Sequence, residues 1–139
     1  MTLQYCTFEL GNLLLGLEAK LVQEVLRAQP VTEVPLSPHA VRGLMNMRGQ
    51  IVLVVDLRRR LGLPEPASDA RRVNVLVRTD DGLVSLLVDR VGDVLEVAPE
   101  NFEAVPDTLD SEARHLLRGA YQLPDRLLLQ LDAHRAAAI

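Results

Sequence analysis

The sequence predicts an all-β protein of two small barrels that lie side by side, with a few short helices. Segments with strand patterning recur at intervals of roughly ten residues. Turn signals built on glycine, proline and aspartate separate these segments, and no helical pattern is long. Together these observations favour a closed β architecture over a parallel α/β sheet. The loop over residues 63–70, which contains two prolines, is the expected joint between the barrels.

The first strand is predicted over residues 5–10, where successive side chains alternate between two faces. Cys6 shares a face with Phe8 and Leu10, and a thiol in that position usually behaves as a small buried hydrophobe. Gly11-Asn12 then offers a tight turn into the apolar residues 13–17. A first β-hairpin is therefore expected at the N-terminus.

Residues 18–27 are predicted to form a short helix, because their apolar residues fall at helical spacing and Pro30 follows. A brief strand is expected over residues 31–34. Next, Ser37-Pro38 supplies an N-cap and a proline at the first helical position, and Gly43 supplies a stop signal. One or two helical turns are expected between them.

The central strand is predicted over residues 51–55, which follow a turn at 46–50 and are apolar at every position. That composition is typical of a strand covered on both faces, so this segment is expected at the centre of the fold. Asp56 can cap a short helix that extends through Leu61 and closes at Gly62.

The second half repeats the strand pattern around new turns. Residues 73–77 and 84–88 alternate on either side of Asp80-Asp81-Gly82, which predicts a second hairpin. The remaining expectations are a strand at 91–97, one or two helical turns within 107–118 ended by Gly119, a last strand at 127–131 after Pro124-Asp125, and a short terminal helix over 133–139.

Composition disfavours several classes of function. The 139 residues carry 15 basic and 19 acidic side chains, a net charge of −4 that disfavours a dedicated DNA-binding protein. Aromatic residues make up only 3%, too few for a base-stacking surface. The single cysteine forbids an internal disulfide and favours a reducing compartment. No signal peptide or long apolar run is recognisable, so a cytoplasmic location without membrane insertion is expected.

No catalytic, metal or cofactor motif is recognisable. His39, His115 and His134 are isolated in sequence, which disfavours a zinc or iron site. The glycines of residues 11–16 match neither a nucleotide-binding loop nor a dinucleotide fingerprint. Asp80-Asp81 is a turn, where paired carboxylates bend the chain. We therefore expect no enzymatic activity, no metal and no cofactor.

Arginines are the remaining candidates. The run at residues 58–60 could dock an acidic partner, although a solvated helix face is the favoured interpretation, and the pair at 71–72 has the same ambiguity. Arg48 lies in a glycine turn, from which its rigid guanidinium can reach a carboxylate. Glu24 is one possible mate.

Residues 42–52, with the sequence RGLMNMRGQIV, and residues 54–63, with VVDLRRRLGL, closely resemble the central signature of the CheW-like family. This family contains the coupling protein of bacterial chemosensory arrays. The similarity extends, in the family's order, to residues 21–25, 88–94 and 119–132, so nearly the whole chain is covered.

The resemblance implies a single domain over residues 1–139 with no catalytic activity. Its fold would be two small five-stranded SH3-like β-barrels packed around a shared apolar seam. On this chain, the first barrel is expected at about 12–66, and the second would combine 1–11 with 67–139. The implied function is that of an adaptor between the cytoplasmic tips of methyl-accepting chemoreceptors and the regulatory domain of a CheA-type histidine kinase.

Matching motif positions imply the partner-binding residues. Glu24 and Arg48 correspond to the family's organising acid and arginine, and the positions at or near partner surfaces are Val22, Gly43 and Val94. Apolar docking surface is expected at Val22, at Val25 and along the seam between the barrels. The alternative for Val25 is that it fills the core.

Two positions depart from the family pattern. Leu53 replaces the usual proline, which restores a backbone donor, and Met47 replaces a leucine of nearly equal volume. With a short C-terminal tail, the first change leaves open a specialised relative that binds the receptor but not the kinase. From a different class, a small barrel that binds an oligonucleotide or a small ligand also remains open.

Overall fold

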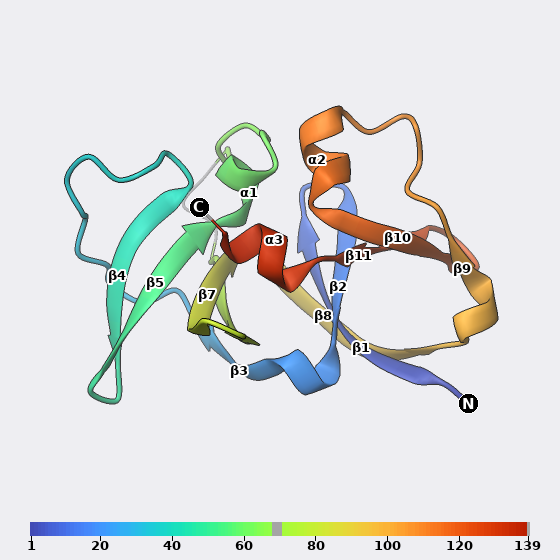
Figure 1. Ribbon diagram of the computed structural model, residues 1–139, viewed down its shortest axis with the longest axis horizontal. Coiled ribbons are helices and arrows are strands. Elements are labelled where there is room, and N and C mark those ends of the chain that lie inside the picture. Colours follow the sequence, from blue (N-terminus) through green and yellow to red (C-terminus); the bar gives the residue numbers. More distant parts are fainter. Residues whose placement is uncertain (68–70, 139) are drawn as a thin grey trace.

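The computed structural model describes residues 1–67 and 71–138, and it contains two β-sheets that lie side by side (Figure 1). The six-stranded sheet has the order β8-β1-β2-β11-β10-β9. Its strands are β1 (Leu3–Leu10), β2 (Leu13–Glu18), β8 (Arg90–Val97), β9 (Phe102–Glu103), β10 (Leu117–Gln122) and β11 (Leu127–Leu131). The five-stranded sheet has the order β3-β6-β7-β5-β4. Its strands are β3 (Val22–Arg27), β4 (Val41–Met47), β5 (Gln50–Asp56), β6 (Val73–Thr79) and β7 (Gly82–Val88).

Three short α-helices each begin after an aspartate. They are α1 (Leu57–Arg60), α2 (Ser111–His115) and α3 (Ala133–Ala137), and the 3-10 turns are η1 (Ala19–Leu21) and η2 (Pro99–Asn101). The side chains of Asp56, Asp110 and Asp132 accept hydrogen bonds from backbone N–H groups in the first turn of their helices. This capping satisfies donors that have no partner within the helix.

The hydrophobic core has three parts. One cluster lies within the five-stranded sheet and another within the six-stranded sheet. The largest cluster combines both sheets, as shown by Phe8 and Leu15 from one and Leu86 and Val88 from the other. Ala136 of α3 is fully buried in this shared cluster, and Figure 1 shows α3 between the two sheets. The two barrels therefore share the apolar seam that the family resemblance implied.

Both predicted hairpins are present, as β1-β2 and as β6-β7. The predicted central strand, the capped helix after Asp56 and the strands at 91–97 and 127–131 are also confirmed. The terminal helix is confirmed over 133–137, and Ile139 lies outside the described residues. The strand β5 was predicted to be covered on both faces, but its residue Ile51 is exposed to solvent.

The predicted helix at residues 18–27 is wrong. After the single turn of η1, the chain continues as β3, in which Val22, Glu24 and Leu26 are more buried than the residues between them. The same apolar residues fit either period over so short a segment, and pairing with the buried strand β6 decides for the strand.

The predicted helix between residues 37 and 43 is also wrong. The residues before β4 form a turn in which the N–H of Val41 donates to the carbonyl of Pro38. Gly43 lies inside β4, because β5 supplies ladder partners to this segment. The brief strand at 31–34 is reduced to one bridge between Thr32 and Leu44. Gly119 likewise lies inside β10 and does not end the helix before it.

The strands are divided between the two sheets in a different way from the predicted division into barrels. Residues 13–18 were placed with the first barrel, but β2 belongs to the six-stranded sheet, where it pairs in parallel with β11. Residues 73–88 were placed with the second barrel, but β6 and β7 complete the five-stranded sheet. The chain thus crosses between sheets at about residues 18–22 and 88–90, and the loop at 63–67 joins α1 to a strand of the same sheet. Residues 68–70, the last part of the predicted joint at 63–70, lie outside the described residues.

A largely buried ion pair ties the second crossover in place. The guanidinium of Arg58 donates to both carboxylate oxygens of Asp89, at 2.8 and 2.6 Å, and also to the carbonyl of Pro64. The other barrel contributes the N–H of Gly11, which donates to Asp89 at 2.8 Å. The hydrogen bond from Arg58, aided by that from Gly11, lowers the pKa of Asp89, although partial burial opposes the shift.

Replacing Asp89 by asparagine is expected to lower the free energy of unfolding by about 2 kcal/mol at pH 7, the usual contribution of a hydrogen bond to a charged group. The pKa of Asp89 is lower in the folded protein than in the unfolded chain. Its carboxylate therefore stabilises the fold at any pH above the unfolded pKa, and this stabilisation is lost as the pH falls through the folded pKa. The difference between wild type and Asp89→Asn should therefore shrink below about pH 4. Urea unfolding at pH 7 and at pH 3 measures it, with the exposed Asp107→Asn as control. A difference that does not depend on pH would contradict the assignment.

Candidate functional site

The turn between β4 and β5 positions Arg48. Met47 pairs with Gln50, so the turn has two central residues, Arg48 and Gly49, and both have positive φ, at 53° and 85°. This geometry is that of a type I′ hairpin turn, which is unfavourable for a residue with a side chain. The Asn46 side chain accepts the N–H of Gly49 at 2.9 Å and supports the turn.

Arg48 reaches Glu24 on β3, with 2.8 Å between its Nη2 and the carboxylate Oε1. The sequence expectation of this pairing is confirmed. Because β3 and β4 are the two edges of the five-stranded sheet, the ion pair joins the edges at one end of the barrel. The Arg48 side chain is 71% exposed, and ion pairs at such exposure contribute little to stability. The pair therefore serves mainly to fix the arrangement of surface charge.

The second carboxylate oxygen of Glu24 does not take part in the ion pair. Its Oε2 is buried and has no hydrogen-bond partner among residues 1–67 and 71–138. A buried carboxylate oxygen without a hydrogen-bond donor is unfavourable.

The predicted apolar docking residues differ in exposure. Val25 on β3 is 40% exposed and Val94 on β8 is 57% exposed, so neither fills the core. Val22 is half-buried against the shared apolar cluster. The seam itself is largely buried core, which makes the expectation of exposed apolar surface there wrong. Val25 and Val94 belong to different sheets, and each lies on an edge strand.

Gly43 is buried and presents no surface of its own. Its φ of 149° and the bridge between Thr32 and Leu44 bring the Thr32 carbonyl against its Cα. A Cβ at this position would lie 2.9 Å from the Thr32 carbonyl carbon. The position therefore supports β4, the strand that leads into the turn carrying Arg48.

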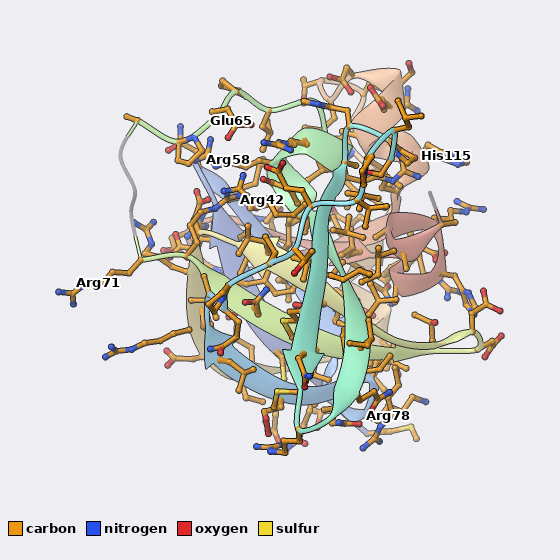
Figure 2. All side chains as sticks on the ribbon, turned by 90° about the vertical axis from the view of Figure 1, so that its left-hand side faces the viewer. Arg42, Arg58, Glu65, Arg71, Arg78 and His115 are labelled. Atoms are coloured by element: carbon orange, nitrogen blue, oxygen red, sulfur yellow. The ribbon has the colours of Figure 1, made fainter. Side chains whose placement is uncertain are left out.

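The arginine run at residues 58–60 has mainly internal contacts, which makes the interpretation as a solvated face wrong. Arg58 pairs with Asp89, and Arg59 pairs with Glu65 at 2.9 Å. Arg60 donates to the carbonyls of Arg135 and Ala138, which holds the end of α3. Figure 2 shows Arg58 and Glu65 at the same end of the molecule. Each partner is distant in the sequence or follows a turn, so the run alone gave no signal of it.

The pair at residues 71–72 separates into two roles. Arg71 is exposed and extends away from the protein (Figure 2). Arg72 is buried and donates two hydrogen bonds to the fully buried carboxylate of Asp56, at 2.9 and 3.1 Å. Asp56 also lies 3.6 Å from Arg42 and from Arg59. Sequence reasoning recognised Asp56 only as a helix cap and missed this network.

Further exposed apolar residues were missed as surface candidates. Val91 accompanies Val94 on β8, and Ile51 is the second residue of β5. Leu36 and Phe102 lie in a turn and in the short edge strand β9. Val91 was predicted only as a strand residue, and nothing in an alternating pattern distinguishes an edge strand from a central one.

The titratable groups show no constellation suited to catalysis within the described residues. Burial raises the pKa of the Cys6 thiol, which disfavours the reactive thiolate. His134 contacts Asp80 at 2.8 Å on an exposed surface. No group of three or more His, Cys, Asp or Glu residues is placed to hold a metal in residues 1–67 and 71–138. None of the helices described is long and apolar enough to cross a membrane.

Comparison with known proteins gives a consistent result. Residues 4–138 match the family model described as a CheW-like domain. The Chemotaxis protein CheW of Rhizobium meliloti strain 1021 is 30% identical over 128 residues, covering 91% of this chain and 83% of that protein. The Chemotaxis protein CheW of Treponema pallidum strain Nichols is 26% identical over 136 residues, covering 95% and 80%.

A solved structure has the same architecture. The scaffolding protein TtCheW from Thermoanaerobacter tengcongensis superposes with a TM-score of 0.89 at 25% sequence identity. The match covers 100% of this chain and 94% of that one. The paired sheets described above are thus shared over the whole molecule.

Proposed function

Because the chain belongs to the CheW-like domain family, a family of chemotaxis scaffold proteins and not of enzymes, we propose that it couples methyl-accepting chemoreceptors to a CheA-type histidine kinase. The cytoplasmic receptor tip and the kinase regulatory domain are the proposed partners, and the cytoplasmic receptor array is the proposed location. The mechanism is binding alone, in which one small protein presents separate surfaces to two others.

One observation carries this proposal beyond family membership. The ion pair between Glu24 and Arg48 joins the edges of a barrel, is largely exposed on the arginine side and contributes little to folding. A strained turn is nevertheless used to place it. Exposed valines on the edge strands β3 and β8 provide apolar anchors of the kind that carry binding energy at interfaces.

The proposed binding residues are Val22, Glu24, Val25, Gly43, Arg48 and Val94. Val25, Arg48 and Val94 are exposed and would contact a partner directly. Glu24 would act by orienting Arg48. Val22 and Gly43 are more buried and would act by supporting the two strands.

Replacing Arg48 by alanine is expected to weaken capture of at least one partner by about tenfold, because an interface loses its oriented charge, while the melting temperature changes little. Binding of the purified full chain to a kinase regulatory domain and to a receptor tip, each tested separately, measures this. Lys20→Ala is the matched control, since Lys20 is similarly exposed and also forms an ion pair, at 3.2 Å with Glu18.

Four results discriminate between the alternatives. Capture of both partners by the wild type, with selective loss in Arg48→Ala, supports the proposal. Capture of the receptor alone selects the specialised relative that does not bind the kinase. Binding to neither partner overturns the coupling role, and unfolding of Arg48→Ala would make Arg48 a structural residue. Val94→Asp provides an independent variant on the other sheet.

A further inference from the structure

A cavity of about 220 Å³ opens at one end of the five-stranded barrel. Arg42 near the start of β4, Val54 near the end of β5 and Leu87 near the end of β7 all line it. The segment 28–31, which follows β3, forms another wall. The cavity is therefore at the opposite end of the barrel from the turn that carries Arg48, and barrel mouths are common places for small ligands.

Among the described residues, the lining combines two arginines with an apolar surface and contains no carboxylate. Val31, Val54 and Leu87 supply the apolar part, and Arg42 and Arg72 supply the charge. The polar side chain of Asn74 also lines the cavity, but it accepts the N–H of Gln29 and donates to Ser85. A cavity of this composition favours a ligand with an anionic end and an apolar body.

Both arginines retain donors. The Arg72 side chain is only 8% exposed, and its buried Nε has no hydrogen-bond partner in residues 1–67 and 71–138. Arg42 lies 3.6 Å from Asp56, which is beyond hydrogen-bond distance. Asp56 is already occupied by Arg72 and by two backbone N–H groups of α1. Asp56 therefore faces the guanidinium groups of Arg42 and Arg72 and also that of Arg59, which pairs in addition with Glu65. This leaves an excess of positive charge beside the cavity.

We propose that this cavity binds a carboxylate carried on a short aliphatic chain. The carboxylate accepts hydrogen bonds from Arg42 and lies beside the guanidinium of Arg72, and the chain packs on Val31, Val54 and Leu87. The volume suits a ligand of about four to six carbons and is smaller than the usual pocket for a drug-sized molecule. A free short-chain acid and the last residue of a peptide share this chemistry. The inference does not depend on the proposed coupling function.

Titration of the full chain with pentanoate, followed by amide and guanidinium NMR shifts, tests the proposal. We expect a dissociation constant on the order of 1 mM, in the range for so small a ligand. Shifts should occur at Val31, Val54 and Leu87 and at Nε of Arg72. Pentanamide, which has the same shape without the charge, should bind at least tenfold more weakly.

An acetylated tripeptide that ends in leucine, compared with its C-terminal amide, distinguishes the two sources of carboxylate. Tighter binding of the peptide acid than of pentanoate assigns the cavity to a chain terminus. Binding of pentanoate alone assigns it to a free acid. Absence of binding by both carboxylates overturns the proposal.

Arg42→Met is expected to weaken pentanoate binding at least tenfold, because methionine keeps much of the apolar stem and removes the charge. Arg71→Met is the matched control, since it removes the same charge from an exposed side chain outside the cavity. Equal weakening by both variants, equal binding of pentanamide, or shifts outside the cavity lining would each overturn the proposal. If Arg42→Met does not fold, the comparison of pentanoate with pentanamide on the wild type still decides.

Discussion

Replacing Asp56 by alanine is expected to lower the free energy of unfolding by about 4 kcal/mol, because the change leaves a buried guanidinium without its counter-charge. Asp56 is fully buried and receives two hydrogen bonds from Arg72, which has almost no access to solvent. The substitution also removes the cap of α1. Urea unfolding at pH 7 measures the difference, with the slope of the transition compared to confirm that the same surface unfolds.

Asp110→Ala provides the control for the capping contribution. Asp110 caps the similarly short helix α2, accepting the N–H of Ala113 at 2.8 Å, so its loss should lower stability by about 1 kcal/mol. The double variant Asp56→Ala with Arg72→Met should recover part of the loss, since it removes the uncompensated charge. Equal effects of Asp56→Ala and Asp110→Ala would show that the arginine network contributes nothing beyond the cap.

Replacing Gly43 by alanine is expected to lower the free energy of unfolding by about 3 kcal/mol through strain and a backbone clash. The φ of 149° disfavours any side chain, and the new Cβ would press on the carbonyl of Thr32. That carbonyl accepts the N–H of Leu44 at 2.9 Å, so the bridge that covers β4 should open. Thermal unfolding gives the stability, and hydrogen exchange at Leu44 reports the bridge.

Gly82→Ala separates the two causes of this expected loss. Gly82 also has a positive φ, of 116°, but a Cβ there would meet no atom within 4 Å in the structure. Its loss should be limited to backbone strain, at about 1 kcal/mol. A Gly43→Ala variant that is no less stable than Gly82→Ala, with Leu44 still protected, would contradict the clash.

The candidate site was only partly predictable from the sequence. Pairing of Arg48 with Glu24 was one possibility that the sequence offered, because Arg48 lies in a glycine turn from which it can reach a carboxylate, and the structure shows the contact. The contacts of Arg58 with Asp89 and of Arg72 with Asp56 were not recognised. Charged side chains are usually solvated, and they are seldom buried unless the fold brings an oppositely charged partner next to them. Here those partners lie far away in the sequence.

By itself the sequence determined the strands whose alternation is long and whose turns are distinctive, as in β1-β2 and β6-β7, and it determined the family through residues 42–63. Tertiary structure decided β3, β4 and the division of the strands between the two barrels. The physical reason is that local periodicity sets which residues can share a face, whereas hydrogen-bond partners and burial come from strands far away in the chain. Val25 and Leu26 suited a helix as well as a strand until β6 supplied the ladder that chose between them.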